Sequence, residues 1–145
     1  MPDKPRLVGV NHIVLEVDDL DAALDFWRAI FDFELRGRGN GHVFLDMGDQ
    51  FIGLFEGKTQ TRDEHRHFGL VVDDRSRVRD LARAAGAEVM ETDFLDLRDP
   101  WGNRIQVVDY ADLQFSKTDA VLRGMGLDLK KSQSAQQELE DKGMG

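Results

Sequence analysis

The chain contains an internal repeat. Residues 66–84, RHFGLVVDDRSRVRDLARA, align without a gap with residues 11–29, NHIVLEVDDLDAALDFWRA, 55 positions earlier. Both copies open with a histidine, His12 in the first and His67 in the second, and both pass from an apolar run into the pair Asp-Asp. This repeat constrains the fold strongly, because each copy must form the same supersecondary unit and bury its apolar face against a neighbour.

Each copy predicts a strand followed by a helix. The runs rich in Val, Ile and Leu are typical of buried strands, and the segments after Asp-Asp carry apolar residues at helical spacing. Asp19 and Asp74 are predicted to cap the helices at their N-termini, and Gly86 is predicted to end the second helix. Three short strands are expected after each helix: 33–36, 42–47 and 50–55 in the first copy, and the segments AEVME, DFLDLRD and NRIQVVDY in the second.

The repeat therefore predicts an α+β fold in which two tandem βαβββ modules form a curved mixed sheet. We expect one domain over residues 1–110, built from module 1 at about 7–56, a polar linker at 57–65 and module 2 at about 66–110.

Residues 111–145 belong to neither module and are expected to form a helical C-terminal extension. Ser116 and Ser134 each have capping-box spacing, so they are predicted to begin two short helices that end at Gly124 and Gly143. The extension is apolar enough to pack on the modules or on a partner subunit. A position over a pocket would favour a lid, and a position on the outer surface would favour a partner site.

Composition excludes several classes of function. The net charge of −9 argues against a nucleic-acid partner, because such proteins need clustered Lys and Arg. The absence of cysteine removes disulfides, thiolate nucleophiles and sulfur metal sites. No apolar run approaches the roughly 20 residues of a membrane span, and the N-terminus lacks a signal peptide, so we expect a cytoplasmic protein.

The paired modules, the histidine that opens each one and the closing segment DPWGNRIQVVDY together resemble the vicinal oxygen chelate superfamily. This group includes glyoxalase I, extradiol dioxygenases, fosfomycin-resistance proteins and bleomycin-resistance proteins. The resemblance covers about residues 8–110 and implies the fold more specifically than the reaction, because the superfamily includes both enzymes and metal-free binding proteins.

The resemblance also implies a metal site. Carried over by position, His12 and His67 match the ligands from the first strand of each module, and Gln106 matches the ligand from the last strand of module 2. That third ligand is usually Glu, whereas this chain has Gln. Because an amide oxygen contributes only a dipole, we expect a weaker metal affinity and a more strongly Lewis-acidic ion. The alternative is that both histidines are core residues hydrogen-bonded to backbone; His65 is expected to be solvated and His42 to be exposed.

Glu56 is the candidate for a fourth ligand or a catalytic base, but two registers are open. Counted from the shared Phe-Leu-Asp that ends at Asp46 and at Asp96, Glu56 corresponds to Gln106. Counted from the strand cores, Ile52 or Leu54 takes that place, and Glu56 lies just beyond the strand.

These residues lead to a hypothesis: a homodimeric small-molecule enzyme, either a glyoxalase-type lyase or isomerase or a dioxygenase. A divalent Fe, Mn, Ni or Zn ion would chelate vicinal oxygens of the substrate, held by His12, His67, Gln106 and Glu56. The alternative is a metal-free protein that sequesters a small molecule or antibiotic, as bleomycin-resistance proteins do. That alternative predicts an aromatic-lined groove at the dimer interface.

Overall fold

Two four-stranded sheets form the framework of the protein, whose computed structural model describes residues 4–145. Sheet A has the order β1-β4-β3-β2 and sheet B the order β5-β8-β7-β6. The strands of sheet A are β1 (His12–Val17), β2 (Leu35–Gly39), β3 (His42–Asp46) and β4 (Phe51–Glu56). Those of sheet B are β5 (Phe68–Val72), β6 (Glu88–Val89), β7 (Leu95–Arg98) and β8 (Arg104–Asp109).

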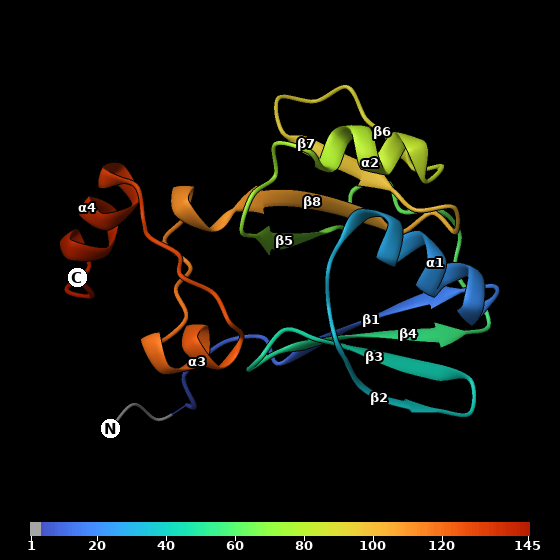
Figure 1. Ribbon diagram of the computed structural model, residues 1–145, viewed down its shortest axis with the longest axis horizontal. Helices are drawn as coiled ribbons and strands as arrows, with labels where there is room; N and C mark the ends of the chain where they lie inside the picture. Colours follow the sequence, from blue (N-terminus) through green and yellow to red (C-terminus); the bar gives the residue numbers. More distant parts are fainter. Residues whose placement is uncertain (1–3) are drawn as a thin grey trace.

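Both sheets are mixed. The first and last strands of each module, β1 with β4 and β5 with β8, pair in parallel, and the remaining pairs are antiparallel. The predicted α+β fold of two βαβββ modules is confirmed (Figure 1). Within residues 4–145 no ladder joins the two sheets, and β1 and β5 each lie at a sheet edge.

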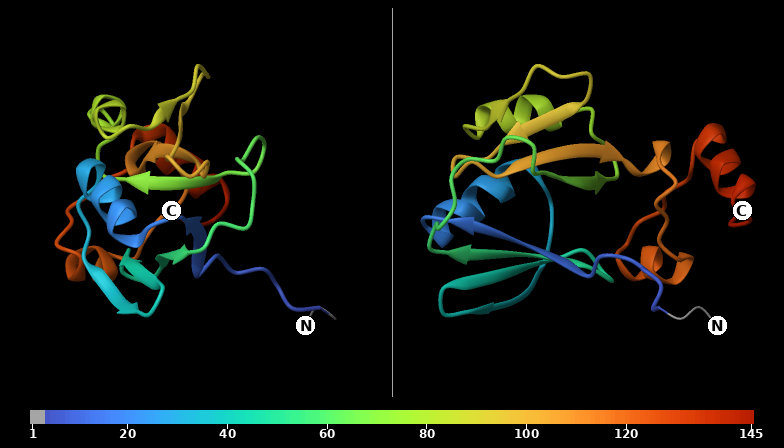
Figure 2. Two further views of the ribbon diagram at one scale, coloured as in Figure 1. Left: turned by 90° about the vertical axis from the view of Figure 1, so that its right-hand side faces the viewer. Right: turned by 180° about the vertical axis from the view of Figure 1, so that it is seen from behind.

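The helices α1 (Leu20–Ile30) and α2 (Val78–Ala84) lie on the same side of the sheets (Figure 2). The predicted cap of α1 is correct, since the Asp19 carboxylate accepts a hydrogen bond from Ala22 N at 2.8 Å. The predicted cap of α2 is wrong. The carboxylate of Asp74 instead accepts from Ser76 N at 2.9 Å, and this local turn delays the start of the helix to Val78.

One apolar core joins the two modules. The side chains that alternate toward the helices from both sheets are almost fully buried together with Trp27 of α1: Leu15, Val17, Val43, Leu45, Ile52, Leu54, Leu97, Ile105 and Val107. At the turn before β8, Trp101 packs edge-on against Phe26 of α1 at 6.1 Å, and Asn103 Nδ2 donates to Glu16 O at 2.9 Å. Module 2 is therefore anchored to module 1 by packing and by a backbone contact.

The C-terminal extension consists of the short turn η1 (Tyr110–Asp112) and the helices α3 (Asp119–Gly124) and α4 (Gln133–Asp141). It gathers at one end of the molecule, at the left of Figure 1. Two helices were expected here, but their predicted starts are wrong. Thr118 and Ser132, which accept from the amides of Val121 and Ala135, provide the caps in place of Ser116 and Ser134.

Two lysines fasten this extension to the modules. Lys117 Nζ donates to Met47 O at 2.7 Å, which ties the approach to α3 to the β3–β4 turn. Lys131 Nζ lies 3.4 Å from the centroid of the Tyr110 ring and donates to Tyr110 O at 2.6 Å, and its burial lowers the pKa of this lysine. The extension thus bridges the end of β8 and the far end of sheet A. No helix in residues 4–145 is long and apolar enough to cross a membrane.

Candidate functional site

Each sheet has one face toward the helices and one opposite face, which we call its open face. Along β1, Leu15 and Val17 point to the core, so His12 and Val14 lie on the open face of sheet A. In sheet B, Leu70 and Ile105 point to the core, which places Gln106 on the open face; the same alternation puts His67, one residue before β5, on that side. The three ligands expected from the resemblance thus all lie on open faces, His12 on one sheet and the other two on the second.

Local hydrogen bonds orient both histidines. His67 Nδ1 lies 2.8 Å from the carbonyl oxygen of His65, and because a carbonyl only accepts, Nδ1 carries the proton. His12 Nδ1 lies 2.8 Å from Asn11 Oδ1, which favours the same tautomer. In both rings the lone pair is therefore on Nε2. A histidine whose Nδ1–H is held by an oxygen while Nε2 is free has the usual arrangement of a metal ligand.

Gln106 is oriented by a buried carboxylate. Its Nε2 donates to Asp96 Oδ1 at 3.1 Å, so its Oε1 remains as an acceptor. Asp96 is 0% exposed, and its other oxygen accepts from Arg104 Nε at 3.0 Å and from Arg104 Nη2. Asp96 was not predicted from the sequence as a site residue. The signal was its position in β7 directly across from Gln106, which requires the register of the strand pair.

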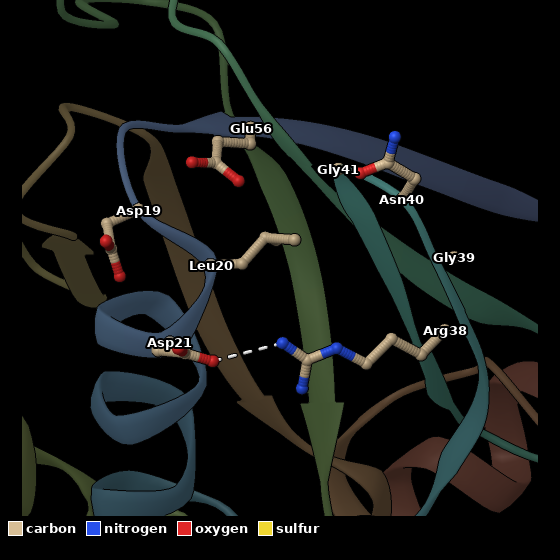
Figure 3. Close-up of a pocket in the computed structure, with 8 residues that line it drawn as sticks. All are labelled: Asp19, Leu20, Asp21, Arg38, Gly39, Asn40, Gly41 and Glu56. Atoms are coloured by element: carbon tan, nitrogen blue, oxygen red, sulfur yellow. Dashed lines mark hydrogen bonds and ion pairs between the residues drawn. The ribbon is translucent and has the colours of Figure 1, made fainter.

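Glu56 lies apart from these residues. It pairs with Val17 of β1, a core-facing residue, and so belongs to the face of sheet A opposite His12. Glu56 lines a polar pocket of about 280 Å³ near the start of α1. In Figure 3, Asp19 and Asp21 lie on one side of this pocket and Arg38 on the other. The structure therefore does not bring Glu56 to His12, as a fourth ligand or a base at that site would require.

Strand pairing shows which residue of module 1 corresponds to Gln106. In sheet B, Gln106 lies between Gly69 of β5 and Asp96 of β7, and in sheet A the equivalent place, between Val14 and Phe44, is held by Gly53. Neither register considered from the sequence is correct, since one chose Glu56 and the other Ile52 or Leu54. Module 1 offers no side chain at the matching position.

The open face of sheet A instead carries an aromatic wall, formed by His42, Phe44, Phe51 and Phe55. Their rings contact one another at centroid distances of 5.0–6.3 Å, and His12 stacks on Phe51 at 4.6 Å with an interplanar angle of 7°. His42 is half-buried against Phe44 and Phe55, which corrects the expectation of an exposed side chain. The wall remains partly open to solvent, since Phe55 is 38% and neighbouring Val14 44% exposed.

This wall was not predicted from the sequence, because its rings come from two separate strands, β3 and β4. They meet only when β3 and β4 pair, which places Phe44 directly across from Gly53. Within residues 4–145, no three side chains among His, Cys, Asp and Glu form a group that could hold a metal. The candidate donors are therefore the two imidazoles and the amide oxygen, divided between the two sheets.

Comparison with known proteins agrees with this architecture. Residues 9–107 match the family described as the Glyoxalase/Bleomycin resistance protein/Dioxygenase superfamily. The chain belongs to this superfamily. An uncharacterized protein of Pseudomonas aeruginosa is 30% identical to this chain over 119 residues, which cover 67% of this chain and 85% of its own length.

Solved structures of superfamily proteins show the same fold. The fosfomycin resistance protein FosX of Mesorhizobium loti aligns with a TM-score of 0.61 and 15% identity, covering 70% of this chain and 91% of its own. A mutant FosX of Listeria monocytogenes, in complex with Mn(II) and a dihydroxypropylphosphonic acid, aligns with a TM-score of 0.59 and 20% identity, covering 70% and 90%. A lactoylglutathione lyase of Agrobacterium tumefaciens aligns with a TM-score of 0.55 and 24% identity, covering 72% and 96%.

Proposed function

We propose that this protein is a metal-dependent enzyme of small-molecule metabolism, a glyoxalase-type lyase or isomerase or a dioxygenase, whose divalent ion is held by His12, His67 and Gln106. The observation that carries the proposal is that all three donors are prepared. Each has one polar atom fixed by a neighbouring oxygen and a second, lone-pair atom left over: Nε2 in the two histidines and Oε1 in the glutamine. If the two histidines were only core residues bonded to backbone, there would be no reason for Gln106 to have the same arrangement of one fixed polar atom and one remaining lone-pair atom.

The donor set fits a borderline divalent ion. Imidazole nitrogen and amide oxygen suit Fe, Mn, Ni or Zn, and the Mn(II) complex of the Listeria FosX supports an ion of this class. When bound, the ion would supply Lewis acidity to two neighbouring oxygens of a substrate. Asp96 holds the Gln106 amide in the required orientation, and the aromatic wall keeps water from the apolar part of a ligand.

We further propose that the protein is a homodimer. The open face of sheet A exposes Val14 and Phe55. In the segment before β1, Leu7 and Val8 are fully exposed and Val10 is more than half exposed. These exposed apolar side chains, together with the edge strand β1 that carries Val14, favour association with a second copy. Size-exclusion chromatography with light scattering checks this proposal, and a stable monomer would reject it.

The metal proposal is tested by plasma mass spectrometry on protein purified without an affinity tag. We expect about one ion per chain in the wild type and in His65→Ala, and none in His67→Ala. His65 is a matched control, because it is an exposed histidine two residues away whose backbone carbonyl, and not its ring, contacts His67. Absence of metal from the wild type after incubation with Fe(II), Mn, Ni and Zn would contradict the enzyme proposal.

The aromatic wall favours a second function. A protein that sequesters a small molecule without metal would need an aromatic surface on its open face, and sheet A has one. That function predicts tight ligand binding in His67→Ala, whereas the enzyme predicts loss of turnover.

A further inference from the structure

An arginine lies on the aromatic wall without a carboxylate partner. Arg36 occupies the place where the register between β2 and β3 shifts, from Leu35 to Gly37. Such a bulge inserts one residue and redirects its side chain. The guanidinium carbon of Arg36 lies 4.3 Å from the centroid of the Phe51 ring, and within residues 4–145 it takes part in no ion pair.

The other arginines of the two sheets are neutralised. Arg38, in the same strand, pairs with Asp21 at 3.0 Å. Arg98 pairs with Glu88 at 2.8 Å, and Arg104 pairs with Asp96. In a chain with a net charge of −9, Arg36 is thus the sheet arginine in the described residues whose charge remains available to an anion.

The wall beside Arg36 is suited to a flat ring. Gly53, at its centre, has no side chain, and a Cβ there would lie 3.0 Å from the Phe55 ring and 3.3 Å from Val14. The rings therefore close over the glycine, and no side chain projects from the middle of the sheet. Aromatic surfaces bind planar rings through offset stacking, and a guanidinium stacked on a ring keeps its N–H edge free for a carboxylate or a similar anion.

We propose that the ligand of this face is a planar aromatic anion, with its ring against Phe44 and Phe55 of the aromatic wall and its anionic group on Arg36, which Phe51 holds in place. The inference deepens the proposed function and rests on it in one respect, because it takes the aromatic wall as part of the ligand site. It adds the class of ligand and a residue that determines specificity.

The test uses two fluorescent probes with the same ring system, anilinonaphthalene sulfonate and the uncharged N-phenylnaphthylamine. Both are titrated into chelator-treated protein, so that the result does not depend on a bound ion. We expect Arg36→Gln to weaken the sulfonate about tenfold, as for the loss of one charged hydrogen-bonded contact, and to change the uncharged probe less than twofold. Arg36→Lys should restore part of the lost affinity, because it keeps the charge without the planar fork.

Arg38→Gln is the matched control, since it removes a guanidinium from the same strand on the helix-facing side. An equal loss of both probes in Arg36→Gln, or an equal effect of Arg38→Gln, would overturn the proposal. So would an Arg36→Gln protein that dissociates into monomers while both titrations stay unchanged, which would assign Arg36 to a subunit contact. If Arg36→Gln weakens the sulfonate but not the uncharged probe, while the wild-type protein binds no metal, the proposed enzyme alone is rejected. If the wild-type protein binds metal but Arg36→Gln affects both probes equally, this inference alone is rejected.

Discussion

The buried carboxylate of Asp96 provides the sharpest test of the candidate site. Asp96→Ala removes the acceptor of two Arg104 hydrogen bonds and one Gln106 hydrogen bond at once. Removing one partner of a buried ion pair costs about 3–5 kcal/mol. Arg104 is 17% exposed and keeps the Glu64 carbonyl as an acceptor, so we expect the lower end, about 3 kcal/mol. For a chain of this size the melting temperature should fall by about 6–12 °C.

Urea unfolding followed by tryptophan fluorescence measures the loss of stability. Asp46→Ala is the matched control, because Asp46 also lies on an open face, but within residues 4–145 its carboxylate accepts a hydrogen bond only from Gly48 N, at 3.4 Å. It should cost less than about 1 kcal/mol. Asp96→Asn keeps an acceptor oxygen without the charge and should cost about 1–2 kcal/mol.

The same variants report on the site. Because Asp96 fixes the amide of Gln106, Asp96→Ala, which removes the acceptor, should weaken metal binding about 10- to 100-fold, as for other residues that orient a ligand. In a double-mutant cycle with Arg104→Met, the coupling energy should exceed about 1 kcal/mol. A coupling near zero, or equal costs for Asp96→Ala and Asp46→Ala, would show that the buried network does not hold the site.

Three further predictions concern the turns and the C-terminal extension. Lys117→Ala should cost about 0.5–1 kcal/mol near neutral pH, because its partner Asp49 is 53% exposed and solvent screens the pair. The hydrogen bond from Lys117 lowers the pKa of Asp49, so the stabilisation by this pair is present above pH 3.8. In acid titrations of unfolding, the difference in free energy of unfolding between wild type and Lys117→Ala should shrink as the pH falls below 3.8. Gly102→Ala should cost about 1–3 kcal/mol in urea unfolding, because φ is +89° and the new Cβ would lie 2.8 Å from the linker backbone. The control is Gly124→Ala, where the new Cβ enters open space and stability should change by less than about 1 kcal/mol. Burial raises the pKa of Asp99, although the hydrogen bonds that it accepts from Asn103 act in the opposite direction. Protonation of Asp99 therefore stabilises the fold below pH 3.8, and this contribution disappears as the pH rises through the raised pKa. An NMR titration of the carboxyl group that finds a lowered pKa would contradict this prediction.

The repeat predicted the modules because equivalent residues of β1 and β5 lie a constant number of positions apart in the sequence. Val14 and Gly69 are equivalent and lie 55 positions apart. The spacing then changes, since Gly53 and Gln106 differ by 53 and Phe44 and Asp96 by 52. The turns differ in length between the modules, so a match of Phe-Leu-Asp in sequence is not a match in register. An odd shift moves a side chain to the other face of the sheet, which is how Glu56 was placed beside Gln106.

A capping residue in the sequence did not by itself fix where a helix begins. Asp19 caps α1 as expected, but Asp74 forms a turn with Ser76, and in the extension Thr118 and Ser132 compete successfully with serines two residues away. Each of these side chains can cap a helix that begins at its own position, so the packing of the helix decides which of them is used.

The glutamine at position 106 is explained by the strand beside it. The proteins that the sequence resembles usually carry Glu at this place, and from the sequence alone the amide looked like a loss of negative charge. Asp96 lies fully buried across the ladder and accepts from the Gln106 amide at 3.1 Å, with Arg104 balancing its charge. A glutamate at this position has no N–H to donate, so two carboxylates would face each other in a buried setting, where like charges are strongly unfavourable. The amide is therefore the side chain that can both satisfy Asp96 and present an oxygen on the open face. The negative charge at this place thus lies one strand away, on the residue that orients the Gln106 amide.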